Sequence, residues 1–251
     1  MSFALRLSFC LMALSISLIC PVFSLAQASS STPPNVVRAP SESDLRALVE
    51  KYFALYDRKD LDGLMGLWSQ KSPDYASFKQ NLQGQFANEN YSLGLPAISR
   101  IKVEGERARL RATVNLTAIN LKNNQNREQR IARNFSLVRE DGKWKVWRSA
   151  AAETDLAEAL AQVKTEAERD ALLADEKELV TSDLAQALVG QGDRLRNQGD
   201  YPQALTTYRL AQSVAEQIGD QPGIATGWYT IGLVHSSQGA YAQALECLMN
   251  S

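Results

Sequence analysis

The stretch RNQGDYPQALTTY (196–208) decides the fold of the second half of the chain, because it returns as SSQGAYAQALECL at 236–248, a shift of 40 residues (236 − 196). Self-similarity at such a period, in a helical composition, predicts stacked helix pairs that share one core. Gly199 and Gly239 are expected to form the turn within each pair. Small residues, Ala204 and Ala244, are expected where the paired helices cross.

The two copies resemble tetratricopeptide repeats at the consensus positions of that family. The matching residues are Leu188, Gly192, Leu195, Gly199, Tyr201, Ala204, Tyr208 and Ala211, and then Trp228, Ile231, Gly232, Gly239, Tyr241, Ala244 and Leu248. Gly192 and Gly232 are expected to let neighbouring helices approach closely. The resemblance implies an all-α helical-repeat segment over 186–251, with one complete and one truncated repeat. The period of 40 exceeds the family's usual 34 residues or so, which implies longer helices.

The commonest use of such repeats is to bind a peptide or a partner protein on the concave surface that the first helix of each pair lines. On that surface we expect partner-binding residues Val189, Asp193, Arg196, Asn197, Tyr229, Leu233, Ser236 and Ser237. Two alternatives remain open. One is small-ligand binding or catalysis in the domain before the repeats, and the other is a structural spacer or a gene fragment.

The second repeat is incomplete at Ser251. Because one helix pair cannot bury its apolar face alone, we expect the chain to be the front part of a longer array, with Trp228, Ile231, Leu245 and Leu248 left uncovered and prone to self-association. The layout resembles the start of exported bacterial proteins whose arrays often lead to a caspase-like CHAT peptidase domain. That peptidase has no counterpart in this sequence.

Strict alternation marks the middle of the chain. Every even residue from Ala108 to Ala118 is apolar, which predicts a half-buried strand, and Asp-Gly in EDGK (140–143) predicts a hairpin. Helical patterns come first: an apolar stripe from Leu45 to Tyr56, a short helix near 61–68 and a third at about 75–87. We therefore expect three helices followed by an antiparallel meander of about four strands over 42–150.

This region resembles the SnoaL-like family, which shares the cone-shaped α+β fold of ketosteroid isomerase and nuclear transport factor 2. The resemblance rests on VEKYFALYDRKDLDGLMGLWS (49–69) and LVREDGKWKVW (137–147). It implies that the interior of the cone can hold a ligand and, in some members, acid–base residues.

No paired catalytic constellation is visible in this domain. Asp57, Asp60 and Asp62 are interpreted as helix caps, and Tyr52 and Tyr56 as core residues, because no partner base or nucleophile accompanies them. We therefore expect no enzyme activity, no catalytic residue and no cofactor. The row Arg107, Arg109 and Arg111 is interpreted as a solvated sheet face rather than an anion site.

The first residues are typical of a cleavable signal peptide: Arg6, a 13-residue apolar run and Ala26 and Ala28 in small-x-small spacing. Cleavage after Ala28 would make the protein exported, periplasmic or extracellular, with no membrane contact after cleavage and Cys247 as its one cysteine. A flexible Ser/Pro-rich linker, 29–41, follows.

Composition excludes several function classes. With a net charge of −1 over 251 residues, nucleic-acid binding is not expected, and a single histidine excludes a multi-histidine metal site within one chain. Residues 151–185 are rich in Ala, Leu and Glu, which predicts a helical connector that covers the end of the repeats. Its charges are interpreted as a solvated helix face.

Overall fold

The computed structural model describes residues 42–251, which lie within one compact unit. The expected signal peptide at 1–28 and the expected linker at 29–41 lie outside the described residues. Within the described part, none of the helices combines the length and the apolar character that crossing a membrane requires.

Three helices open the described chain: α1 (Glu42–Asp57), α2 (Leu61–Leu67) and α3 (Tyr75–Asn88). The predicted stripe of α1 is buried at Leu45, Val49, Tyr52 and Phe53. Helix α2 begins where the Asp60 carboxylate accepts a hydrogen bond of 2.8 Å from the Gly63 amide, which satisfies a donor that the first turn leaves without a partner.

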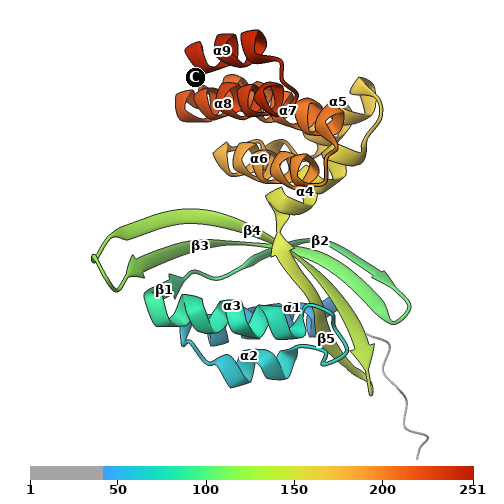
Figure 1. Cartoon of the computed structure of the whole chain (residues 1–251). Coiled ribbons are helices and arrows are strands. Elements are labelled where there is room, and N and C mark those ends of the chain that lie inside the picture. The colour runs from blue at the N-terminus through green and yellow to red at the C-terminus, as the bar shows by residue number, and fades with distance from the viewer. Residues whose placement is uncertain (1–41) are drawn as a thin grey trace, which may run out of the picture. The chain divides into compact units, whose positions relative to one another are not determined.

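Five strands form one antiparallel sheet: β1 (Glu89–Leu93), β2 (Ala97–Glu104), β3 (Arg107–Asn120), β4 (Asn126–Glu140) and β5 (Lys143–Ala151). The order is β1-β3-β4-β5, and β2 pairs with the other end of β3. The meander of about four strands is therefore confirmed with one addition, the short β1, whose sequence ENYSL carries no strong alternation of apolar residues. Figure 1 shows α1, α2 and α3 on one face of this sheet.

The core of the α+β domain lies between the three helices and the inner face of the sheet. The even residues of β3 point into it, as the alternation predicts: Ala108, Leu110, Ala112 and Val114 are each 0–3% exposed. Aromatic rings fill the centre, with Tyr52 edge-on to Phe135 at 5.1 Å and Trp68 stacked on Phe78 at 4.2 Å between ring centroids. These edge-to-face and offset arrangements are the ones that ring quadrupoles favour.

The connector forms α4 (Ala152–Gln162), α5 (Glu166–Asp175) and a single 3₁₀ turn, η1 (Lys177–Leu179). Thr165 caps α5 because its hydroxyl accepts a hydrogen bond of 3.3 Å from the Glu168 amide, which is one half of a capping box. Helix α4 follows β5 without a loop, and its Ala152, Leu156 and Leu160 share a core with Ala132 of β4 and with the first repeat helix.

The repeat segment contains α6 (Ser182–Asn197), α7 (Tyr201–Ile218), α8 (Gln221–Ser237) and α9 (Tyr241–Met249). Gly199 and Gly239 have φ angles of +83° and +76°, as the predicted turns within each pair require. Asp200 and Asp220 cap α7 and α8 with their side chains. The fold class predicted from the sequence, an α+β domain followed by an all-α repeat segment, is confirmed.

Two interpretations of charged residues hold only in part, since Arg107 and Arg109 are exposed, as expected, but Arg111 and Glu176 are not. Arg111 is 5% exposed and therefore does not lie on a solvated sheet face, because Glu176 of the connector pairs with its guanidinium. The connector's charge run is likewise not entirely solvated, since the side chain of Glu176 is only 13% exposed.

Candidate functional site

The repeat helices pack closely because of a glycine in α6. A β-carbon on Gly192 would lie 2.5 Å from a ring carbon of Tyr208, well inside van der Waals contact. The Tyr208 hydroxyl donates a hydrogen bond of 2.7 Å to Asp193. Burial, and then this hydrogen bond and the nearby negative charge, raise the pKa of Tyr208 above its ordinary value. The expected close approach at Gly192 is confirmed.

A groove of about 430 Å³ lies along α6 and α8, the first helices of the two repeats. It has an apolar floor, at Ala185 and Ala211, and polar groups along its sides. Its lining residues are Ser182, Ala185, Gln186, Val189, Ala211, Asp220, Pro222, Gly223 and Thr226. An apolar floor with a few polar groups suits a peptide side chain whose backbone needs hydrogen bonds.

The predicted partner-binding residues fall into three groups. Val189 lies in the groove. Asp193 and Arg196 are engaged within the repeat, through Tyr208 and through their own ion pair of 3.2 Å. The remaining five lie farther along α6 and α8, with Tyr229 49% exposed: Asn197, Tyr229, Leu233, Ser236 and Ser237.

The consensus spacing did not single out the residues that form the sides of the groove. Gln186 lies one turn before Val189, and Pro222 and Thr226 lie at the start of α8. A helical period of 3.6 residues extended backwards from Val189 would have found Gln186. The residues that α8 contributes to the groove depend on how the two repeats stack. The spacing of residues within one repeat does not predict that stacking.

A second pocket, of about 310 Å³, lies in the α+β domain, where residues of α1, α3 and the sheet meet residues of α4 and α6. Tyr56, Tyr91 and Glu153 supply titratable groups there, and α6 contributes Asp183. Burial raises the pKa of Tyr56 to about 12, and burial together with the charge of Asp183 raises the pKa of the Glu153 carboxyl. Arg127 and Arg133 line the same pocket.

The three aspartates near the end of α1 do not reach this pocket's lining. Asp60 caps α2, and the Asp57 carboxylate accepts a hydrogen bond of 2.9 Å from the Leu93 amide. Asp62 is exposed in the first turn of α2, where the helix dipole favours an anion. Their interpretation as helix caps is confirmed for Asp60, whereas Asp57 instead binds the amide of a residue in β1.

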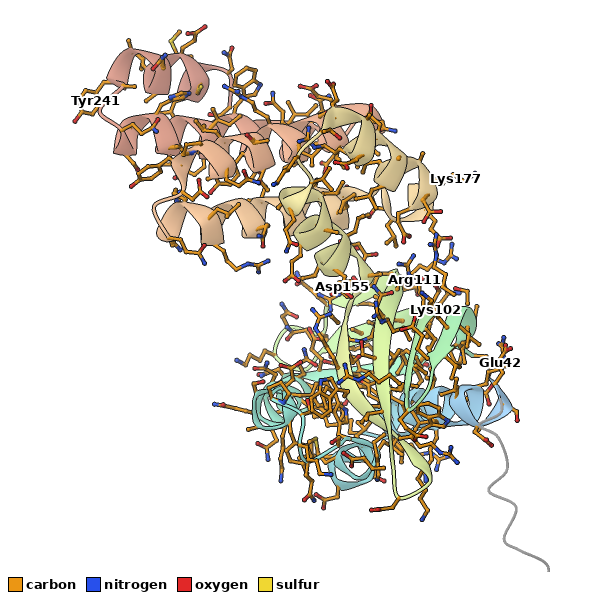
Figure 2. The ribbon with its side chains drawn as sticks, turned by 90° about the vertical axis from the view of Figure 1, so that its right-hand side faces the viewer. Glu42, Lys102, Arg111, Asp155, Lys177 and Tyr241 are labelled. Atoms are coloured by element: carbon orange, nitrogen blue, oxygen red, sulfur yellow. The ribbon has the colours of Figure 1, made fainter. Side chains whose placement is uncertain are left out.

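Ion pairs and hydrogen bonds on the outer face of the sheet join the α+β domain to the helical connector, and Figure 2 labels two of the residues that form them, Arg111 and Asp155. Arg111 donates to both carboxylate oxygens of Glu176, and Arg100 pairs with Asp175 at 2.9 Å. Asp155 of α4 accepts hydrogen bonds from Asn134 (2.8 Å) and Arg148 (2.6 Å). Carboxylates of the helical part are thus bound by guanidinium groups of the sheet.

Comparison with known families gives two matches. Residues 183–249 match the family model of tetratricopeptide repeats. Residues 47–156 match a model described as the C-terminal domain of the anti-sigma-I factor RsgI9. No curated protein matches the chain.

Solved structures resemble the α+β domain at low identity. A ketosteroid isomerase-like protein from Erwinia carotovora atroseptica shows 13% identity over 43% of this chain and 92% of its own, with a TM-score of 0.40. A putative dehydratase of the NTF2-like family from Streptomyces avermitilis shows 14% identity over 43% and 93%, with a TM-score of 0.37.

A third resemblance is to a putative polyketide cyclase from Xanthomonas campestris, at 18% identity over 43% of this chain and 90% of its own, with a TM-score of 0.34. The expected resemblance to the nuclear transport factor 2-like fold is thus found again, whereas the resemblance to CHAT-peptidase proteins stays a prediction. The helices from α6 to α9 lie in the segment that matches the tetratricopeptide-repeat model, and they follow the α+β domain of three helices and one antiparallel sheet.

Proposed function

We propose that this chain is an exported protein-interaction module, and that it binds an extended peptide or a partner protein in the groove between α6 and α8. Tetratricopeptide repeats generally mediate protein–protein interaction. The observation that carries the proposal is the groove itself. It offers about 430 Å³ over an apolar floor, and Gln186 and Thr226 expose side chains along its sides.

The test is site-specific photo-crosslinking in the native host. A photoreactive residue at Gln186 or Thr226 is expected to crosslink to the same partner. The same residue at Ser213, exposed on α7 and outside the groove lining, is the control. A purified partner should then lose at least about tenfold in affinity for Gln186→Arg, equivalent to roughly 1.4 kcal/mol. Equal crosslinking from Ser213, or unchanged affinity, contradicts the proposal.

Export is a proposal that rests on the sequence before the described residues. Mass spectrometry of the protein from its native host is expected to find Ser29 as the first residue, after cleavage behind Ala28. A mature protein that retains Met1 contradicts it. Export would place the groove in the periplasm or outside the cell.

A longer array is also proposed, because the last helix exposes apolar side chains. Tyr241 is 73% exposed, Leu245 62% and Met249 78%. Reading the DNA beyond the Ser251 codon tests this proposal, since further in-frame repeats are the expected result and an immediate stop codon is the contrary one. The same surface is proposed to drive self-association of the 251-residue chain.

A second candidate function is small-ligand binding in the pocket beside Tyr56 and Glu153. The observation that favours it is the raised pKa of Glu153, whose carboxyl faces a cavity that tyrosines also line. Groups with perturbed pKa values in a cleft are candidates for functional roles. A thermal-shift screen with aromatic and carboxylic compounds tests it. Any hit should vanish with Glu153→Gln while the unliganded melting temperature stays within a few degrees.

We propose that the Asp57, Asp60 and Asp62 group has no catalytic role. The structural contacts of Asp57 and Asp60 support this, since each carboxylate accepts a backbone hydrogen bond. If the domain turned over a substrate and the three Asp→Asn variants abolished turnover with the fold intact, the proposal would be wrong.

A further inference from the structure

The outer face of β3 and β4 carries a row of guanidinium groups, of which one is already bound to a carboxylate. Arg107, Arg109 and Arg111 alternate along β3 and therefore project from one face of the sheet. Arg111 is buried beneath the connector and donates two hydrogen bonds to the Glu176 carboxylate. A guanidinium group on this face of the sheet thus already binds a carboxylate within the chain itself.

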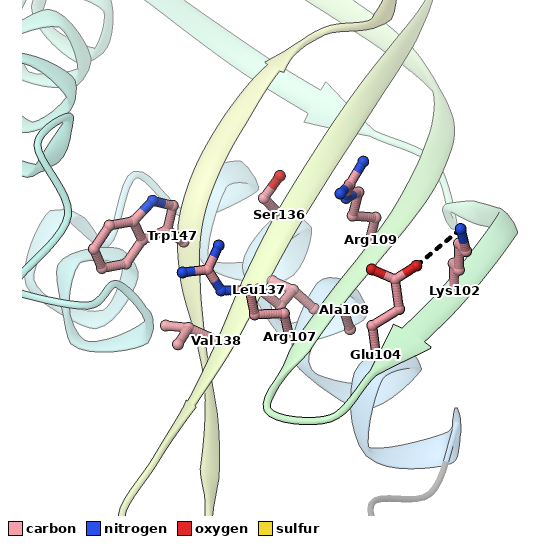
Figure 3. Close-up of a pocket in the computed structure, with 9 residues that line it drawn as sticks. All are labelled: Lys102, Glu104, Arg107, Ala108, Arg109, Ser136, Leu137, Val138 and Trp147. Carbon is pink, nitrogen blue, oxygen red and sulfur yellow. Dashed lines mark ion pairs between the residues drawn. The ribbon is translucent and has the colours of Figure 1, made fainter.

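The row continues beyond the connector into an open pocket of about 230 Å³. Arg107 and Arg109 are exposed there, next to Lys102, Ser136, Val138 and Trp147 (Figure 3). Registers place Arg107 opposite Val138 and Arg109 opposite Ser136. The pocket therefore combines cationic groups with an aliphatic and an aromatic surface.

The charges in this pocket do not cancel. Glu104 is the one carboxylate in its lining, and it pairs with Lys102 at 2.8 Å. The charge of Arg109 also acts on Glu104, but within residues 42–251 neither Arg107 nor Arg109 forms an ion pair with a carboxylate. The lining therefore has three cations and one anion, a net charge of +2, and two neighbouring guanidinium groups repel one another.

We propose that this pocket binds an extended acidic peptide segment of a partner protein, with its carboxylates on Arg107 and Arg109 and an apolar side chain against Trp147. Alternate residues of an extended peptide lie about 6.6 Å apart, the same separation as alternate residues of a strand. A peptide with acidic residues at alternate positions thus matches Arg107 and Arg109 together. Each guanidinium can hold a carboxylate in the two-bonded manner that Arg111 shows with Glu176.

A second copy of this chain fits the pocket less well than an acidic peptide. If the same face of two copies met, Arg107 and Arg109 of one would oppose those of the other, and like charges that oppose one another across an interface are costly. A small carboxylate would engage one guanidinium and leave the second without a partner. An acidic segment avoids both costs.

The test uses the full chain and a fluorescent Glu peptide, acetyl-Glu-Ser-Glu-Ser-Leu-Ser-Glu-Ser, whose leucine supplies the apolar side chain. The uncharged Gln peptide is acetyl-Gln-Ser-Gln-Ser-Leu-Ser-Gln-Ser. Fluorescence anisotropy at low salt is expected to show binding of the Glu peptide only. The variant Arg107→Gln/Arg109→Gln should weaken it at least about tenfold, because charge-assisted hydrogen bonds to two carboxylates are lost. The matched control is Arg58→Gln/Arg130→Gln, which removes the same charge from two exposed sites of the same domain and should change the affinity less than twofold.

A second measurement locates the peptide. In ¹H–¹⁵N spectra the indole N–H signal of Trp147, assigned with Trp147→Phe, should shift on addition of the Glu peptide, and it should not shift in the Arg107→Gln/Arg109→Gln variant. Circular dichroism confirms that each variant is folded. Sedimentation velocity checks that the chain does not dimerise through this face.

Several results would overturn the proposal. They are equal binding of the Gln peptide, equal loss in the control variant, no peptide binding at all, or an unshifted Trp147 signal. A further such result is that free glutamate or citrate displaces the fluorescent Glu peptide as efficiently as the unlabelled peptide does at the same carboxylate concentration. That result would show that the pocket binds small anions. A dimer that the Arg107→Gln/Arg109→Gln variant dissolves would assign it to a second copy.

Discussion

The guanidinium of Arg111 on β3 forms a two-bonded ion pair with the carboxylate of Glu176, at 2.5 and 3.1 Å, across the junction between the sheet and the helical connector. Both side chains are largely buried, at 6% and 13% exposure. Asn134 accepts a further hydrogen bond of 2.9 Å from Arg111 Nε. The charge is thus enclosed by partners on both the sheet and the connector.

Replacing Arg111 is expected to destabilise the protein strongly. Arg111→Leu leaves the largely buried Glu176 carboxylate with Arg100, at 3.2 Å, as its one remaining cation among the described residues, and breaking one side of a buried pair costs up to about 3–5 kcal/mol. The urea midpoint of unfolding should fall accordingly. In Arg111→Leu/Glu176→Leu much of that loss should be recovered, because no charge remains without a partner.

The control for this prediction is Lys102, which pairs with Glu104 at 2.8 Å, with both side chains exposed. Lys102→Leu should cost only about 0–1 kcal/mol, as is usual for exposed ion pairs. If Arg111→Leu and Lys102→Leu shift the urea midpoint equally, the buried pair does not have the role assigned to it.

Two glycines of α6 should respond to alanine in opposite directions. Gly192→Ala places a β-carbon 2.5 Å from the Tyr208 ring, so the helices must separate, at a cost of about 1–3 kcal/mol for overpacking. Gly190→Ala meets nothing within 4 Å and should stabilise the helix by roughly 0.5–1 kcal/mol. Thermal unfolding of the two variants checks this. A gain for both would mean that Tyr208 moves aside freely.

Periodicity explains what the sequence could predict of the fold. The alternation from Ala108 to Ala118 identified the inner face of β3, and the repeated Gly-x-Tyr identified the turns before α7 and α9, because both depend on neighbours in the chain. The short β1 was missed because it is five residues long and pairs with the far end of β3. Its existence depends on a partner distant in sequence.

The ion pair of Arg111 was missed for a similar reason. Arg107, Arg109 and Arg111 have the same pattern in the sequence, yet only Arg111 is covered, by a glutamate 65 residues later. Burial of a charge depends on which segment packs over it. The groove between α6 and α8 was likewise predictable at Val189 and not at Pro222 or Thr226, which come from the stacking of the next repeat.

High pH should weaken the fold through its buried tyrosines. Burial raises the pKa of Tyr56 to about 12, and it also raises the pKa values of Tyr52, Tyr91 and Tyr208 above the ordinary 10.0. A group whose pKa is higher in the folded state binds its proton more tightly there. Its contribution is therefore complete below pH 10 and is lost as the pH rises from about 10 to 12.

Urea unfolding at pH 8, 9, 10 and 11 measures this loss, which should begin near pH 10. Tyr56→Phe, which also removes a hydrogen bond of 2.8 Å to Gln85, should flatten the decline between pH 10 and 11. The control is Tyr241→Phe, at a ring that is 73% exposed. An equal decline in wild type and Tyr56→Phe would show that this ring is not responsible.

The exposed apolar side of α9 is expected to control self-association. Leu245 and Leu248 are 62% and 42% exposed, whereas Cys247 is buried. Leu248 lies partly beside Gly232, as Cys247 does. Of the four residues expected to lack cover, Ile231 is in fact 4% exposed and Trp228 is half-buried, so the two that are uncovered both lie on α9.

Leu245→Glu/Leu248→Glu should therefore reduce association, because charges replace exposed apolar area of the kind that marks association sites. The free energy of unfolding should change by less than about 1 kcal/mol, since exposed sites tolerate substitution. Ala242→Glu/Gln243→Glu adds the same charge to α9 at two exposed positions without a large apolar side chain and is the control. Sedimentation velocity over a range of concentrations should show dissociation for the leucine variant alone. If both variants dissociate equally, net charge and not the apolar side of α9 governs the association.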